Sequence, residues 1–420
     1  PLQIRQHSMS TGQRHETIAA AADLFDNLAN GYKLTVMEQQ GAGQISGEVL
    51  NRAIGALCFV LQDCFRYYRT VPPRVYHDLH RLYHHARRAG LLDVQSPAEP
   101  GEQGTGTAGL YKLGMLLSLT DTERLAEGEL GLLADVLREH VDTCRVVQGG
   151  SWAGNGEGLF LLDVDSDACP VACTTLTSPA EIATPYLLDA TDMLRLLRAR
   201  LDDIPERVRQ RSPEAMVLQR LQPAEQGASL RREQRHRDGR WVGLVMGLGE
   251  IHAQLMRVSA GNAPDSSTGE SVPLACRVLD SSENGMKLFV EAGGAGDARV
   301  GDLLGVIEGE PGQEMLRLAC IRSLRVLPGS GMESGVQLIA GGVGPVYCSL
   351  PEKPDADAVP ALFLPAEEDQ DVAATLVASA GLYAAGCAMT IDVGGRDIHV
   401  RAGRLISDSP VFDRFEFSAE

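Results

Sequence analysis

The sequence predicts an α+β multidomain protein, in which a helical N-terminal region is followed by β structure. Its 420 residues exceed the usual size of one domain. Apolar residues recur at helical spacing through residues 13–145, and short apolar runs bounded by turn residues, typical of strands, follow Arg235. We expect these parts: a helical bundle at 1–147, a mixed α/β connecting region at 148–228, a β domain at 229–341, a linker at 342–358 and a C-terminal β module at 359–420.

The N-terminal region is predicted to be an irregular bundle of helices. The first should end at Asn30-Gly31, because glycine and asparagine favour helix C-termini. Ser46 is expected to cap the second helix, and Pro72-Pro73 to open the third. No fixed period repeats, so the pattern does not predict a solenoid. The apolar positions at helical spacing are Ile18, Ala21, Phe25, Leu28, Ile54, Leu57, Leu61, Phe65, Leu79, Leu82, Tyr83, Ala86, Leu113, Leu116, Leu117, Leu130, Leu133, Val136 and Leu137.

The connecting region and the C-terminal module carry weaker patterns. Leu159–Val164 and Val171–Thr175 are predicted to pair as strands. Ser212-Pro213 predicts a short helix over Glu214–Leu221, with a linker from Gln222 to Ser229. The further apolar positions are Met193, Leu194, Leu197 and Leu201 on one helix, Ile398, Val400 and Ala402 in a strand, and Phe412, Phe415 and Phe417 in another.

Composition narrows the class of protein. No apolar run reaches the length of a membrane span, and the first residues lack the apolar core of a signal peptide. Nine cysteines, mostly in apolar runs and without framework spacing, indicate reduced thiols in a cytoplasmic protein. A net charge of −18 argues against a nucleic-acid binder, which would present a broad basic face. The oligomeric state stays open, and a homo-oligomer is compatible with the sequence.

A basic stretch, Leu230–Arg237, stands out in this acidic chain. From Arg231 to Arg240 there are five arginines against Glu233 and Asp238. A guanidinium group binds guanine O6 and N7 in a bidentate way and also binds phosphate. Arg231 and Arg235 are four residues apart, so one small anionic ligand could meet both. Taken alone, such a charge run is more often a solvated linker.

A second stretch, Asp280–Gly285, is predicted to be a turn before the apolar strand Met286–Val290. Asp280 can accept backbone N–H groups in an Asx-turn, and Ser282 adds a hydroxyl. Gly285 is expected to supply a positive φ. Taken alone, this pattern is that of an ordinary β-turn.

Together, Arg231-x-x-x-Arg235 and Asp280-x-Ser282-x-x-Gly285 resemble the RxxxR and (D/N)xSxxG signature of the PilZ domain family, over roughly residues 229–341. The resemblance implies a six-stranded antiparallel β-barrel that binds cyclic di-GMP. It also implies that Arg231 and Arg235 grip guanine and phosphate, while Asp280, Ser282 and Gly285 form the opposite wall.

Two further arginines lie near the signature, and the spacing between its two halves is unusually long. Arg232 and Arg237 are candidates for extra clamps. The 45 positions from Arg235 to Asp280 exceed the family's usual spacing. The extra length is predicted to hold a short amphipathic helix over Gly249–Val258 and a polar segment over Ser259–Ser271, which should be poorly ordered.

Other clusters point to no further chemistry. His77, His80, His84 and His85 share one predicted helix, but no acidic residue or cysteine completes a metal site, so a solvated or partly buried histidine face is favoured. Cys169-x-x-x-Cys173 has neither zinc-ribbon nor thioredoxin spacing. The glycines at 341, 342 and 344 lack the context of a phosphate-binding loop. We therefore expect no enzyme, cofactor or metal.

The sequence favours a bacterial cyclic di-GMP receptor that regulates motility or biofilm formation. Its arginine-rich linker would clamp the nucleotide onto the barrel and transmit binding to the helical region, where a protein partner is expected. The alternative is a PilZ-like interaction scaffold in motility or pilus regulation that does not need the nucleotide.

Overall fold

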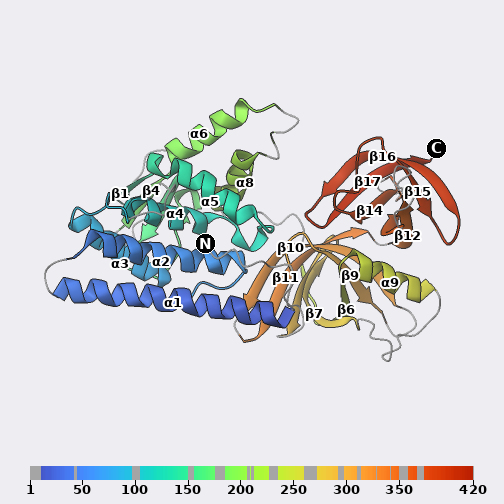
Figure 1. Cartoon of the computed structure of the whole chain (residues 1–420), viewed down its shortest axis with the longest axis horizontal. Helices are drawn as coiled ribbons and strands as arrows, with labels where there is room; N and C mark the ends of the chain where they lie inside the picture. The colour runs from blue at the N-terminus through green and yellow to red at the C-terminus, as the bar shows by residue number, and fades with distance from the viewer. Residues whose placement is uncertain are drawn as a thin grey trace. The chain divides into compact units, whose positions relative to one another are not determined.

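In the computed structural model the chain divides along its sequence into two units, Pro1–Arg231 and Arg232–Glu420 (Figure 1). Each unit is described by itself. The residues that the structure describes are 11–41, 45–96, 105–149, 156–175, 185–205, 209, 212–226, 235–259, 272–291, 298–309, 314–327, 329–340, 342–349, 358–366 and 373–419. None of the helices in these ranges is both long and apolar enough to cross a membrane.

The first unit is built on helices with a buried apolar face, as the periodicity predicts. Its described α-helices before the sheet are α1 (Thr11–Gly41), α2 (Gly47–Arg66), α3 (Val75–Arg88), α4 (Thr107–Leu119) and α5 (Glu129–His140). Ile54 and Leu61 on α2 are fully buried, and so are Leu79 on α3 and Leu116 on α4. Ser46 occupies the N-cap position of α2, which confirms the expected start of that helix, but its side chain makes no capping hydrogen bond, so the expected cap is wrong.

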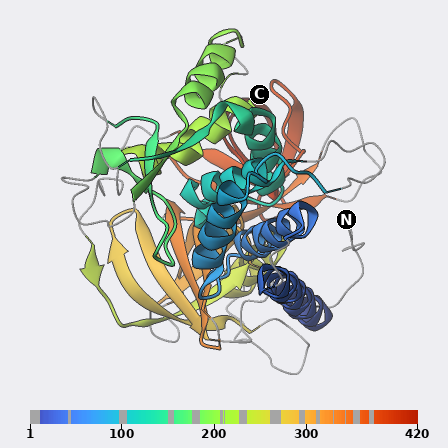
Figure 2. The same cartoon turned by 90° about the vertical axis from the view of Figure 1, so that its left-hand side faces the viewer.

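The expected end of the first helix at Asn30-Gly31 is wrong, because α1 continues to Gly41. Ala29 and Val36, on either side of Gly31, are 2% and 4% exposed in the same core. This packing along α2 offsets the cost of about 1 kcal/mol that a glycine imposes inside a helix. The two helices run side by side (Figure 2).

The first unit also contains a four-stranded antiparallel sheet in the order β1-β4-β2-β3. Its strands are β1 (Arg145–Gln148), β2 (Leu159–Asp163), β3 (Val171–Ala172) and β4 (Pro185–Asp189). The predicted pairing of β2 with β3 is confirmed at Phe160↔Ala172, whereas Cys173–Thr175 form a 3₁₀ turn. Phe160 and Leu188 join the same core as the helices, so this region and the bundle share one hydrophobic core.

In the described ranges after the sheet lie the helices α6 (Thr191–Asp202) and α8 (Pro213–Gln226). The Ser212 hydroxyl accepts the Ala215 N–H at 3.1 Å, so the predicted cap and helix start are confirmed. The linker expected from Gln222 to Ser229 is wrong in its first part, because α8 runs on to Gln226. Residues 227–234 lie outside the described ranges.

The second unit contains a six-stranded antiparallel β-barrel, which confirms the expected fold. Its strands are β6 (Trp241–Met246), β7 (Leu274–Ser282), β8 (Gly285–Glu291), β9 (Leu303–Glu308), β10 (Met315–Leu327) and β11 (Gly331–Ala340). They pair in the order β7-β6-β9-β10-β11-β8, and the β7–β8 hairpin closes the ring. The two-residue strand β5 (His236–Arg237) continues the β6 edge along β7.

Six more strands form a second closed barrel in the order β12-β13-β14-β17-β16-β15. They are β12 (Gly344–Ser349), β13 (Val359–Leu364), β14 (Thr375–Ser379), β15 (Ala388–Asp392), β16 (Asp397–Asp408) and β17 (Phe412–Ala419). The predicted linker at 342–358 is therefore wrong over β12. Val346 and Cys348 alternate with less buried neighbours in that strand, and both point into the barrel core.

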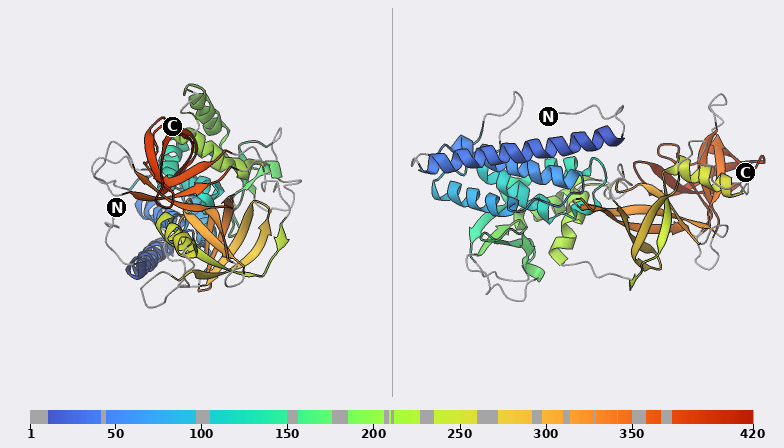
Figure 3. Two further views of the ribbon diagram at one scale, coloured as in Figure 1. Left: turned by 90° about the vertical axis from the view of Figure 1, so that its right-hand side faces the viewer. Right: turned by 90° about the horizontal axis from the view of Figure 1, so that it is seen from below.

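The helix predicted inside the long insertion is present as α9 (Leu248–Ser259), and it links the two barrels. Ile251 and Leu255 pack in one cluster with Leu303 of the first barrel and Leu362 of the second. The His252 ring also meets the Tyr347 ring edge-on, with centroids 4.6 Å apart. The polar segment predicted to be poorly ordered, Ser259–Ser271, lies almost entirely outside the described residues. Figure 3 shows α9 against the C-terminal strands.

Candidate ligand-binding site

The predicted turn is the hairpin between β7 and β8. Ser282 pairs with Gly285 at its tip, and Asp280 pairs with Lys287 further down. The register shifts between Val278 and Asp280, which marks a β-bulge. Such a bulge bends the strand and redirects its side chains. The Asp, Ser and Gly of the signature therefore lie within one short hairpin.

Arg235 is brought to this hairpin from a position 45 residues earlier in the chain. Its Nη1 lies 2.5 Å from Asp280 Oδ1, and both side chains are partly exposed, at 32% and 25%. An Asx-turn was expected at Asp280, but the described contact of its carboxylate is this ion pair. The contact fixes a guanidinium beside a carboxylate at the rim of the hairpin, so hydrogen-bond donors and acceptors are presented side by side.

Gly285 lies next to this pair. The reason why this position needs a glycine differs from the positive φ that the sequence predicts. Its φ is not among the positive values of the described glycines, so a left-handed conformation does not explain it. A Cβ at this position would instead lie 2.9 Å from the Val336 carbonyl oxygen on β11. The same Cβ would lie 3.8 Å from Arg235 Nη2 and 3.8 Å from Ser282 Oγ. Close approach of the neighbouring strand therefore requires glycine here.

Ser282 and Ser281 have different partners. The Ser282 hydroxyl donates to the Gly285 carbonyl oxygen at 3.3 Å and so spans the hairpin tip. The Ser281 hydroxyl donates to Asp238 Oδ2 at 3.2 Å, on the segment that follows β5. The hairpin is thus tied to the stretch that carries Arg235.

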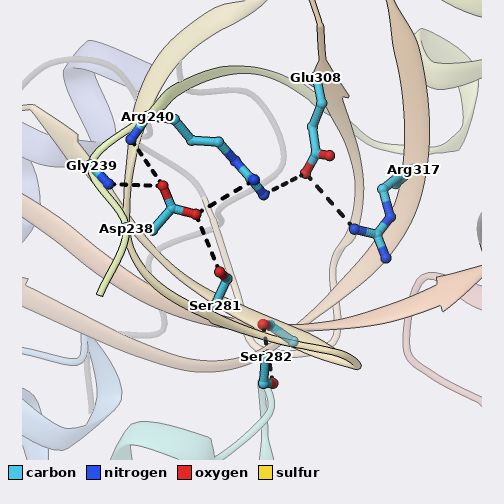
Figure 4. Close-up of polar contacts among 8 residues, drawn as sticks. Asp238, Gly239, Arg240, Ser281, Ser282, Glu308 and Arg317 are labelled. Atoms are coloured by element: carbon cyan, nitrogen blue, oxygen red, sulfur yellow. Dashed lines mark hydrogen bonds and ion pairs between the residues drawn. The ribbon is translucent and has the colours of Figure 1, made fainter. Parts of the chain in front are cut away.

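Asp238 anchors the segment that follows Arg235, a role beyond the counter-charge that the sequence indicates. Its Oδ1 accepts the N–H groups of Gly239 at 2.8 Å and Arg240 at 3.1 Å, which closes a turn (Figure 4). Burial by itself would raise the pKa of Asp238, but these N–H groups and the Arg240 charge lower it overall. The Asp-Gly dipeptide, a common turn signal, could have revealed this anchor.

A chain of charges continues from Asp238 across the barrel (Figure 4). Arg240 lies between Asp238 and Glu308, with its Nη2 3.1 Å from Glu308 Oε1. Glu308 in turn lies 3.9 Å from Arg317 Nη1. These contacts hold the segment after β5 to β9 and β10. They therefore help to fix the position of Arg235, which directly precedes β5.

The remaining predicted ligand residues are only partly described. Arg231 and Arg232 lie outside the described ranges, so of the two signature arginines the structure describes Arg235. Arg237 is in β5 with an exposed side chain, opposite Asp280 in register. The set that the structure brings together is Arg235, Asp280, Ser282 and Gly285.

The histidine cluster of α3 has neighbours that are typical of protein packing. His80 is 1% exposed, and its Nδ1 lies 2.7 Å from the Tyr111 hydroxyl. His84 Nε2 lies 3.0 Å from the Tyr186 hydroxyl. No group of three or more metal-ligating side chains occurs in the described parts of the chain. Cys169 is exposed, whereas Cys173 is buried in a small cluster with Leu161 and Leu187.

Comparison with known proteins finds the same receptor family at both ends of the chain. Residues 2–149 match the N-terminal domain of the cyclic-di-GMP receptor FimW, and residues 349–419 match the FimW C-terminal β-barrel domain. The cyclic-di-GMP receptor FimW of Pseudomonas aeruginosa is 26% identical over 209 residues, which cover 47% of this chain and 34% of that protein. The match thus spans about a third of the relative's length. The chain therefore matches the domain models of the cyclic-di-GMP receptor FimW family in its N-terminal helical region and in its C-terminal barrel, on either side of the barrel that carries the hairpin site.

Proposed function

We propose that this chain is a bacterial cyclic di-GMP receptor and that the first barrel binds the nucleotide with a PilZ-like signature. The observation that carries the proposal is the pair of Arg235 and Asp280, 2.5 Å apart beside Gly285. The name of the Pseudomonas aeruginosa relative adds support, since that protein is a cyclic-di-GMP receptor.

The chemistry of the pair suits guanine. The base presents acceptors at O6 and N7, which match the donors of the Arg235 fork. It also carries N–H donors, which a carboxylate such as Asp280 accepts. Ser282 adds a small hydroxyl, and the absence of a side chain at Gly285 lets β11, Arg235 and Ser282 lie close to one another. Arg231 would supply the second cation, with Arg232 and Arg237 as extra clamps on the phosphates.

The position of the arginines along the chain supports a coupling role. The two units divide between Arg231 and Arg232, so the proposed clamp coincides with the junction of the units in the sequence. We infer that a ligand held by this stretch restricts the arrangement of the units. It can do so only by as much as it binds one arrangement more tightly than another.

The helical region is the proposed contact for a protein partner in motility or biofilm regulation. Leu34 and Met37 of α1 are 61% and 67% exposed, and Phe59 of α2 is 56% exposed. Apolar surface of this kind is what a partner protein would cover.

The cytoplasm stays the proposed location, with seven of the nine thiols buried.

Calorimetric titration of the full chain with cyclic di-GMP tests the proposal. Each bidentate guanine contact is worth about 1–3 kcal/mol, so Arg235→Ala should weaken binding by about tenfold or more. Arg404→Ala is the matched control, because Arg404 forms a similar ion pair with Glu416 at 2.6 Å in the second barrel. No binding by the parent chain would favour the nucleotide-independent scaffold. A turnover assay with intact cyclic di-GMP tests the expectation that the chain is not an enzyme.

A further inference from the structure

A second guanidinium group lies across the hairpin site, on β10. Arg322 Nε donates to Gln337 Oε1 at 2.9 Å, and both side chains are exposed. Gln337 of β11 pairs in register with Gly285 of β8, so the two residues are direct cross-strand neighbours. Adjacent strands are about 4.8 Å apart. Arg235 and the Arg322–Gln337 pair therefore flank the same backbone position from opposite sides.

These groups share the outer face of the barrel. Met286, which follows Gly285, is 1% exposed, and Val336, which precedes Gln337, is 3% exposed. Both side chains face the interior of the barrel. Since side chains alternate along a strand, Gly285 and Gln337 face outward. Gly335, two residues before Gln337, is on the same face, and the Ser323 side chain lies against it. Arg235 Nη2 lies 3.8 Å from the Cβ position of Gly285, on this same face, so one ligand could meet both guanidinium groups.

Arg322 differs from three nearby cations of the barrel in the charge of its described partner. Arg235 pairs with Asp280, Arg240 with Asp238 and Glu308, and Lys287 with Glu333. The described contact of Arg322 is to the neutral amide of Gln337. Its positive charge is thus not offset by that partner, and the bond through Nε orients the group while leaving the two terminal nitrogens to face a ligand.

We propose that Arg322, oriented by Gln337, binds a phosphate of the cyclic dinucleotide on the side of the site opposite Arg235 and Asp280. The inference rests on the proposed function of the barrel. A planar guanidinium fork is suited to bidentate contact with phosphate, whereas the ammonium group of lysine acts as a point charge. Arg322 is thereby a ligand-binding residue outside the signature, and Gln337 is its positioning residue.

Titration of full-length variants with cyclic di-GMP tests the inference. Arg322→Ala should weaken binding by about tenfold, and Arg322→Lys should fall between Ala and the parent because it lacks the fork. Gln337→Glu should also weaken binding, because it places a carboxylate beside Arg322. Arg325→Ala is the matched control: it removes the same charge from the same strand, but Arg325 is opposite Glu333 in register, further from Gly285.

Salt adds a readout that a merely structural role would not change. Screening weakens contacts between exposed charges, so affinity should fall less steeply with added NaCl in Arg322→Ala than in the parent. Equal thermal melts of parent and variants would show that the fold is kept. If Arg322→Ala matches the parent in affinity and in salt dependence while Arg235→Ala loses affinity, the role of Arg322 is rejected and the proposed function stands. If the parent chain does not bind at all, both fail.

Discussion

A methyl group added at Gly285 gives a sharp test of why the signature glycine is needed. The new Cβ would lie 2.9 Å from the Val336 carbonyl oxygen, closer than real Cβ contacts come. The obstacle is backbone, so no side-chain rotation relieves it and β8 must move away from β11. Overpacking of this kind costs about 1–3 kcal/mol. At roughly 2–4 °C per kcal/mol for a unit of this size, Gly285→Ala should melt about 2–12 °C below the parent.

The same methyl group also reaches the ligand site. It would lie 3.8 Å from Arg235 Nη2 and 3.8 Å from Ser282 Oγ, so cyclic di-GMP affinity should fall by about tenfold or more. Gly239→Ala is the matched control in the same barrel, because a Cβ there meets nothing within 4 Å and its φ is not positive. Circular dichroism melts and calorimetric titrations measure the two effects. If Gly285→Ala behaves like Gly239→Ala in both, the steric explanation is refuted.

Further expectations concern single side chains and the junction. Arg235→Lys should recover only part of the affinity, since lysine lacks the fork, and full affinity in titrations would contradict this. Ser282→Ala should lower affinity by about threefold with an unchanged melt, because it removes only one hydroxyl. Burial lowers the pKa of His80 from 6.5 in the folded chain. At a pH between this lowered pKa and 6.5, the unfolded chain therefore binds more protons than the folded chain. Stability should therefore fall as pH drops through about 6.5, and His80→Gln should flatten part of this dependence in pH-resolved melts. Cyclic di-GMP should slow tryptic cleavage from Arg231 to Arg237 and change the small-angle scattering curve, and superimposable curves would reject the change in arrangement while leaving binding intact.

Helices and the hairpin were the most predictable parts of the fold. The periodicity that located α2 to α5 is local, because residues three and four apart meet on one helix face. The same local logic failed at Gly31, where contacts with α2 decide the outcome. It also missed β1 and β4, which are only four and five residues long. Strands this short carry too few alternations to stand out, and β12 was hidden in a segment rich in Gly, Pro and Asp.

The signature residues were predicted without their contacts. Asp280, Ser282 and Gly285 lie within six positions, so the sequence alone places them in one turn. Arg235 is remote in the chain, and only the resemblance to a known family suggested that it meets them. No family resemblance suggested the hydrogen bond between Ser281 and Asp238. An Asp-Gly turn in the sequence does not indicate which strand the turn will contact.

By itself, the sequence determined the helical and β regions, the hairpin, and the pattern of arginines that points to an anionic ligand. These depend on spacing within a few residues, where periodicity and turn chemistry act. The tertiary structure decided the 2.5 Å approach of Arg235 to Asp280, the contact that forbids a side chain at Gly285, and the closure of the second barrel. Each of these joins strands that are distant in the chain. Their register follows from burying whole faces of a sheet together, which no local stretch of sequence specifies.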